Sequence, residues 1–183
     1  LLQSSAASDV YKRQVIKAKR PKNIEAFLMP IQCPECGSKL KKEEGEAILR
    51  CCEGIQCPAQ RKQSIMHFAS RKAMDIDGLG EKIIDQLLEN KMISDFTDLY
   101  TLDLGCLNGL ERFGEKSSKN LIESIRKSKE TTLGRLIYAL GIRGVGEATA
   151  KDLAKEFGTI TNIKAQTLHS LEGVDDIGPT VSC

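Results

Sequence analysis

A five-residue pattern that recurs four times constrains the fold of this chain more than any other feature. An apolar residue, two further positions, an apolar residue and a glycine occur at 76–80, 110–114, 142–146 and 174–178. The closing glycines are 34, 32 and 32 residues apart, and an apolar residue lies seven positions before each of them. Spacing this regular indicates a repeated supersecondary unit. Because helical patterns of apolar residues follow the first three glycines, we predict a mainly α-helical fold of four tandem units, each a helix, a tight glycine turn and a helix.

The helices between the turns are predicted from their capping residues. Ser94 is expected to cap a short helix before the second unit. Thr131 or Thr132 can cap the helix before the third unit, and Thr167 the helix before the fourth. Gly158 has the position of a glycine at a helix C-terminus. The sequence stops where the second helix of the fourth unit is expected to start, so we expect that unit to be truncated.

Four cysteines ahead of the repeats have the spacing of a zinc site. Cys33, Cys36, Cys51 and Cys57 give C-x2-C-x14-C-x5-C. Four thiolates form a closed tetrahedral shell, which is typical of a structural rather than a catalytic zinc ion. Cys52 in place of Cys51 gives C-x2-C-x15-C-x4-C, which is also acceptable, so the spacing leaves both open. A segment this small has little core of its own, and the metal is expected to supply much of its folding energy.

Charge is distributed unevenly along the chain. Residues 1–74 carry 14 Lys and Arg against 7 Asp and Glu, a net +7, whereas residues 75–183 carry 13 against 18, a net −5. The basic first part suits a polyanion. No apolar run approaches the ~20 residues of a membrane span. Since the cysteines have metal spacing and nothing indicates export, we expect a reducing, cytoplasmic location.

Basic residues also flank a helix predicted over 60–74. Arg61, Lys62, Arg71 and Lys72 can face either solvent or phosphate, and the pattern leaves both interpretations open.

The glycine turns themselves favour anion binding. Glycine lets the backbone approach another surface closely, and the amides at the N-terminus of the following helix, with the helix dipole, attract phosphate. Such contacts read the nucleic-acid backbone and not its bases. We therefore predict contacts with duplex DNA at Gly78, Gly80, Lys82, Arg112, Gly114, Lys116, Lys119, Arg143, Gly144, Gly146 and Lys151. Arg112 and Asp176 replace the first glycine of the turn in units two and four, which are expected to bind phosphate less well.

Four segments besides the cysteine tetrad carry a family resemblance: CPAQRK at 57–62, MDIDGLG at 74–80, YALGIR at 138–143 and VGEATA at 145–150. Together they resemble the zinc-finger and helix-hairpin-helix region of bacterial NAD-dependent DNA ligases, over about residues 15–182. In that family the zinc spacing matches Cys51 rather than Cys52.

The resemblance implies a role in sealing nicks in duplex DNA during replication and repair. In the family, a lysine in a Lys-x-Asp-Gly motif of a nucleotidyltransferase domain takes AMP from NAD and passes it to the 5′-phosphate, and the 3′-hydroxyl then displaces it. That motif does not occur in this sequence, so we expect no catalytic residue here and no activity from this segment alone. The implied cofactors are a structural Zn²⁺ in this segment, and NAD and Mg²⁺ in the whole enzyme. The implied partners are nicked DNA and the missing nucleotidyltransferase and OB-fold domains of the same chain.

We predict four parts: a disordered or foreign segment at 1–14, the end of an OB-fold domain with a linker at 15–30, a four-cysteine zinc finger at 31–60 and a helix-hairpin-helix domain at 61–183. The segment is expected to be cut at both ends and to act as a monomer. Two alternatives stay open. One is a stand-alone zinc and hairpin DNA-binding repair protein without ligase activity, and the other is a helical module that binds proteins.

Overall fold

The computed structural model describes residues 28–42, 48–107, 109–111, 113–174 and 177. The chain divides into two units, Leu1–Ile31 and Gln32–Cys183, and the fold below is that of the second. The predicted foreign segment at 1–14 and residues 15–27 of the predicted OB-fold end and linker lie outside the described residues. Arg112 and Asp176 lie outside them as well.

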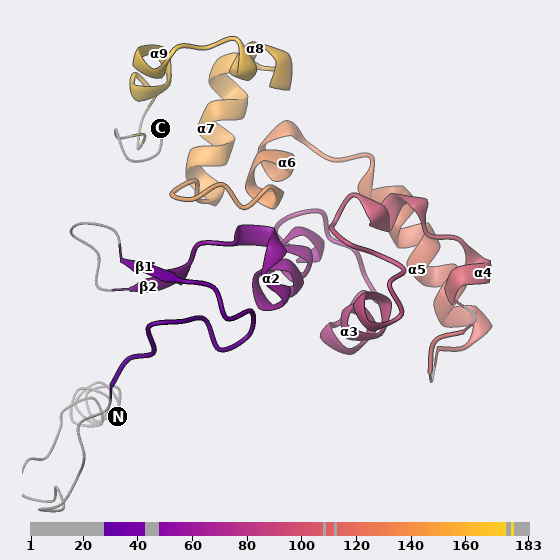
Figure 1. The fold of residues 1–183 in the computed structure, drawn as a ribbon. Coiled ribbons are helices and arrows are strands. Elements are labelled where there is room, and N and C mark those ends of the chain that lie inside the picture. Colours follow the sequence, from indigo (N-terminus) through magenta and orange to yellow (C-terminus); the bar gives the residue numbers. More distant parts are fainter. Residues whose placement is uncertain (1–27, 43–47, 108, 112, 175–176, 178–183) are drawn as a thin grey trace, which may run out of the picture. The chain divides into compact units, whose positions relative to one another are not determined.

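The second unit begins with a small β-hairpin (Figure 1). Strand β1 (Leu40–Lys42) pairs antiparallel with β2 (Leu49–Cys51), with Lys41 opposite Arg50. A 3-10 turn, η2 (Gly54–Gln56), then leads into helix α2 (Pro58–Ala69). Proline is favoured at the first position of a helix because its missing N–H has no intrahelical acceptor there. Since α2 crosses the boundary predicted between residues 60 and 61, the cysteine-rich segment and the first repeat unit share a helix.

Helix α2 ends at Ala69, five residues before the predicted end at Met74. Ser70 has an extended backbone, and its carbonyl accepts the N–H groups of Ala73 and Asp75 in a turn. That turn folds back on the helix end, where the N–H of Met74 donates to the Phe68 carbonyl at 3.0 Å. Ala73 and Met74 are therefore buried without being helical, and burial periodicity alone does not separate the two cases.

The remaining elements are helical. They are α3 (Glu81–Glu89), the 3-10 turn η3 (Asp98–Thr101), α4 (Leu104–Leu107), α5 (Glu115–Ser128), α6 (Leu133–Ala139), α7 (Glu147–Phe157), α8 (Ile160–Lys164) and α9 (Leu168–Glu172). The pairs α2–α3, α4–α5 and α6–α7 each enclose one glycine turn, and α9 precedes the fourth. The predicted mainly helical fold is confirmed, whereas the count of four complete units stays a prediction. No helix in the described ranges is long and apolar enough to cross a membrane.

Two of the three predicted caps occur as expected. The Thr132 hydroxyl accepts the N–H of Arg135 at the start of α6, and the Thr167 hydroxyl that of Ser170 at the start of α9. Gly158 closes α7 with a positive φ of 71°. The Ser94 cap is wrong.

At Ser94 the donor and the acceptor are reversed. Its own N–H donates to the Asp98 carboxylate at 2.7 Å, and the short helix there, η3, begins only at Asp98. A carboxylate is a stronger acceptor than a hydroxyl, so the acid organises this turn.

Two hydrophobic cores hold the helices together. The first core, from units one and two, is centred on Ile65, Ile84, Leu87, Leu99 and Leu121. The second core, from unit three and the start of unit four, is centred on Ile137, Val145, Ala150, Leu153 and Ile177. We call α2–α5 the first module and α6–α9 the second module. They are joined at α6, because Tyr138 packs against both cores and its carbonyl contacts His67 Nε2 at 2.7 Å.

Candidate metal centre and nucleic-acid interface

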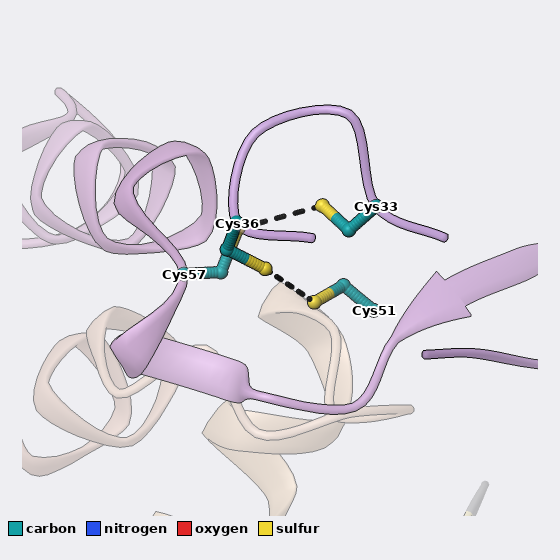
Figure 2. A group of neighbouring side chains, drawn as sticks. All are labelled: Cys33, Cys36, Cys51 and Cys57. Atoms are coloured by element: carbon teal, nitrogen blue, oxygen red, sulfur yellow. Dashed lines mark hydrogen bonds between the residues drawn. The ribbon is translucent and has the colours of Figure 1, made fainter. Parts of the chain in front are cut away.

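The four cysteines of the predicted zinc site come together in the structure (Figure 2). Their sulfurs all lie within 4.8 Å of one another, with Cys33 and Cys57 3.9 Å apart and Cys36 and Cys51 3.4 Å apart. Three local structures supply them: the turn before β1 carries Cys33 and Cys36, the end of β2 carries Cys51, and Cys57 is the N-cap residue of α2. Gly37 closes the first turn with a φ of 73°, which few other residues adopt readily.

The spacing of these sulfurs fits a zinc ion. A Zn–S bond of about 2.3 Å places the sulfurs of a tetrahedral site about 3.8 Å apart, close to the two distances above. Cys52, the rival to Cys51, is exposed and lies outside the cluster. The donor set, four thiols without a carboxylate, is that of a structural zinc site.

Two thiols of the cluster have pKa values shifted in opposite directions. Hydrogen bonds from Ser38, first from its side chain and then from its backbone, lower the pKa of Cys36 from 9.0 to about 6 and favour the thiolate. At Cys51 the backbone N–H of Glu53 acts in the same direction, but burial and the neighbouring thiols outweigh it and raise the pKa to about 12. Thiolates crowded together repel one another, so all four deprotonate only around a divalent ion.

The closing glycines of the first three turns have the same backbone conformation. Gly80, Gly114 and Gly146 have φ of −81°, −81° and −82° and ψ of 169°, 165° and 179°. Each is the N-cap of the helix that follows, and its carbonyl accepts the N–H four positions on, at 3.1, 3.0 and 2.9 Å. The sequence pattern therefore produces one turn three times.

These glycines leave the helix N-termini open. A glycine N-cap offers no side chain to the first amides, and none of the three helices has a side-chain cap. In the part of the chain that the structure describes, the N–H groups of each closing glycine and of the next two residues have no acceptor. All three closing glycines are exposed. The amides are thus available to an external acceptor.

The fold itself does not require glycine at these closing positions. A Cβ added to Gly80, Gly114 or Gly146 would meet nothing within 4 Å, and their φ is one that any residue adopts. The first glycines of turns one and three differ, because Gly78 and Gly144 have φ of 84° and 80°. Their conformation disfavours any other residue. The closing glycines leave room for something outside the chain.

The comparisons with known proteins agree with this geometry. A family model of the NAD-dependent DNA ligase C4 zinc finger domain matches residues 32–59, and a helix-hairpin-helix motif model matches residues 135–183. A DNA ligase of Saccharophagus degradans is 52% identical over 168 residues, which are 92% of this chain and 25% of the relative.

The chain belongs to the NAD-dependent DNA ligase family. It spans about a quarter of the length of that relative. The predicted family and the predicted zinc finger are confirmed, and the alternative of a stand-alone repair protein is not favoured.

The predicted basic contacts that lie among the described residues of this ligase segment are exposed, and two of them pair with an acid on their own helix. Lys82, Lys116 and Arg143 lie on the surface beside the turns. Lys119 contacts Glu115 at 2.6 Å and Lys151 contacts Glu147 at 2.9 Å, each one helical turn apart. Both acids are the first residue of a helix, where they interact favourably with the dipole.

The spacing of acids and lysines in the sequence already indicates these two ion pairs. In units two and three a glutamate directly follows the closing glycine, and a lysine lies four residues further on. That spacing places the two side chains on one face of a helix.

The basic residues that flank α2 have different surroundings. Lys62 contacts Glu81 at 2.9 Å and Asp85 at 2.7 Å, and Arg61 donates to the Ile55 carbonyl. These two side chains stabilise the packing of the family's zinc finger against the first hairpin. Arg71 and Lys72, in the turn after α2, are exposed.

Proposed function

We propose that this chain is the segment of an NAD-dependent DNA ligase that grips duplex DNA beside the nick, with the hairpin amides as its phosphate contacts. One observation carries the proposal. The same turn presents exposed, unpaired amides three times, behind glycines that the fold does not need. A phosphate oxygen is the acceptor that such a site favours, because the helix dipole and the N–H groups both point at it.

Backbone contact suits an enzyme that must act on any sequence. Amides that donate to phosphates carry no base information. The proposed contacts are Gly78, Gly80, Lys82, Arg112, Gly114, Lys116, Lys119, Arg143, Gly144, Gly146 and Lys151. Turns one and three, which have both glycines, are expected to bind more strongly than turns two and four.

The zinc ion has a structural part in this proposal. Cys33, Cys36, Cys51 and Cys57 would hold it, and it would fasten the β-hairpin to the start of α2. We propose that residues 31–60 form the zinc finger and residues 61–183 the hairpin domain.

Sealing the nick belongs to the whole enzyme. Since the 183 residues contain no Lys-x-Asp-Gly motif, nucleotide transfer and the binding of NAD and Mg²⁺ are assigned to a nucleotidyltransferase domain, aided by an OB-fold domain. We expect the enzyme to act as a monomer in the cytoplasm.

DNA binding is tested by fluorescence anisotropy on the zinc-loaded chain. Three duplexes of unrelated sequence, intact and nicked, are titrated between about 50 and 200 mM salt, the range over which phosphate contacts lose affinity steeply. Similar affinities for all sequences with a steep salt dependence are expected. Binding that ignores salt, or that selects one sequence, contradicts the proposal.

Ligase function is tested with a chimera. The matching region of the Saccharophagus degradans DNA ligase is replaced by this chain, and nick sealing is measured on a labelled duplex. We expect sealing to be retained. A folded, zinc-loaded chimera that binds DNA without sealing it would assign the chain to another process.

A further inference from the structure

A cleft of about 480 Å³ lies where the first and second modules meet. Arg71 and Lys72, in the turn after α2, line one side, and Arg135 and Tyr138 of α6 line another. Residues 147 and 151 of α7 complete it. Chain segments more than 60 residues apart therefore build one surface.

The cleft is held in shape by its own residues. Arg135 donates from Nε to the Ala73 carbonyl and from Nη2 to the Arg71 carbonyl, both at 2.7 Å. These bonds fix the turn that carries Arg71 and Lys72. On the other side Gly134 lets α6 approach α7, since a Cβ there would lie 3.3 Å from the Lys151 Cα. The position of the basic groups thus follows from the packing.

The charge of the cleft is positive. Four cations and the Glu147 carboxylate line it, and Asp75 lies 3.6 Å from Arg135 Nη2. Glu147 contacts Lys151 at 2.9 Å and Lys72 at 3.2 Å. Lys151 first and Lys72 second lower the pKa of Glu147, so the carboxylate is charged at neutral pH and acts as an internal counter-ion.

The cleft adjoins the third hairpin. Glu147 directly follows Gly146, and the amides of both residues are unpaired within the described part of the chain. Because Glu147 also lines the cleft, a phosphate on those amides would be next to it, with the neighbouring phosphates of the same strand on either side.

We propose that this cleft is a second phosphate site, which takes a phosphodiester of the strand held by the third hairpin, so that both modules bind one stretch of DNA backbone. The inference rests on the proposed function and adds Arg71 and Lys72 to its contacts, with Arg135 holding the turn that carries them. A phosphate replaces the Glu147 carboxylate as partner of Lys72 and Lys151. The Arg71 side chain suits this ligand because the planar fork of a guanidinium matches two phosphate oxygens.

Two variants test the site, one that removes positive charge from the cleft and one that removes its negative charge. The double variant Arg71→Gln/Lys72→Gln alters two exposed side chains and leaves the Arg135 bonds to backbone carbonyls in place. Duplex affinity is expected to fall about tenfold, and the slope of log K against log salt to become less steep by about 2. Glu147→Gln removes the internal competitor, and its duplex affinity is expected to rise about threefold, which loss of a merely structural residue would not produce.

The matched control is Lys127→Gln. Lys127 is 76% exposed and pairs with Glu123 on its own helix, much as Lys72, at 71%, pairs with Glu147, but it does not line the cleft. Its duplex affinity is expected to change less than twofold. The assignment is overturned if Lys127→Gln loses as much duplex affinity per removed charge as the double variant does. It is also overturned if Glu147→Gln does not bind duplex more tightly than the wild type.

A second arm separates DNA from a free anion. Inorganic pyrophosphate is titrated into the chain and the amide NMR shifts around the cleft are followed. Pyrophosphate that binds there more weakly than duplex, and is displaced by it, supports the proposal. If the double variant loses pyrophosphate but keeps full duplex affinity, the cleft serves a small phosphoanion instead. If the wild-type chain does not bind duplex at all, both the proposed function and the cleft assignment fail. If the wild-type chain binds duplex but the variants bind it equally well, only the cleft assignment fails.

Discussion

The first and third hairpins have the same backbone in different surroundings. Their first glycines have φ of 84° and 80°, and their closing glycines −81° and −82°. Yet Ile76, which opens the first turn, is 4% exposed, whereas Ile142, which opens the third, is 46% exposed. The local sequence determines the turn, and the module around it determines which side chains are covered.

The supports of the two hairpins differ in kind. Hairpin one stands on α2, whose start is tied to the cysteine cluster and whose Lys62 pairs with Glu81 and Asp85 of α3. Hairpin three stands on the close packing of α6 against α7. The same turn is therefore supported in hairpin one by a helix tied to the cysteine cluster, and in hairpin three by close helix packing at Gly134.

Removing zinc is expected to have the largest effect and to separate the two hairpins. Structural zinc contributes about 10 kcal/mol or more to the folding of small domains. Chelation should therefore unfold residues 31–60 first and loosen hairpin one, while hairpin three keeps its amide protection in hydrogen exchange.

The cysteine variants sharpen the zinc prediction. Cys33→Ala is expected to reproduce chelation, and Cys52→Ala to change neither metal content nor folding, since Cys52 lies outside the cluster. A normal zinc content in the Cys33 variant would refute the ligand set.

The reverse experiment is Gly134→Ala. The added methyl would lie 3.3 Å from the Lys151 Cα and 3.4 Å from the Ala150 carbonyl, so α6 and α7 must separate. We expect a loss of about 1–3 kcal/mol in the free energy of unfolding, with exchange protection lost in hairpin three and kept in hairpin one. Equal loss in both hairpins would show that the modules unfold as one.

A pair of substitutions in one turn separates stability from binding. Gly78→Ala places a methyl at a φ of 84° and should cost about 1–2 kcal/mol. At Gly80→Val the added Cβ would meet nothing within 4 Å, and the expected cost is about 1 kcal/mol or less, since valine is a poorer N-cap than glycine. Gly80→Val should nevertheless weaken duplex binding, and Gly146→Val should do the same in hairpin three. Unchanged affinity in both folded valine variants would remove these glycines from the contacts.

The smallest expected effect is a change in stability at low pH. The pKa of Glu147 lies below its ordinary value of 4.5 because of Lys151 and Lys72. The stability it contributes is therefore fully present above about pH 4.5 and is lost as the pH falls through the lower folded value. Denaturant unfolding of wild type and Glu147→Gln between pH 6 and pH 3 should converge at the acid end. A constant difference over that range would contradict the ion-pair explanation.

The sequence predicted what depends on neighbouring residues. The first three hairpin turns, the Thr132 and Thr167 caps and the closing Gly158 follow from local geometry, and each occurs where expected. Even the four-cysteine cluster forms from short-range turns around one β-hairpin.

What depends on distant segments was not predicted. Residues 70–74 follow the apolar pattern of the helix but form a turn, in which Ala73 and Met74 pack into the first core while Arg71 and Lys72 stay exposed. The cleft could not be predicted from the sequence for the same reason. Its two sides are joined by bonds from the Arg135 guanidinium to the backbone carbonyls of Arg71 and Ala73. No local pattern in the sequence encodes those bonds.

Cys57 contributes one sulfur to the cysteine cluster and is also the N-cap residue of α2. Under the proposed function, the availability of zinc would therefore govern how tightly the enzyme holds DNA, and the joining chemistry would belong to the nucleotidyltransferase domain. We expect scarcity of the metal to release the DNA before it impairs that chemistry.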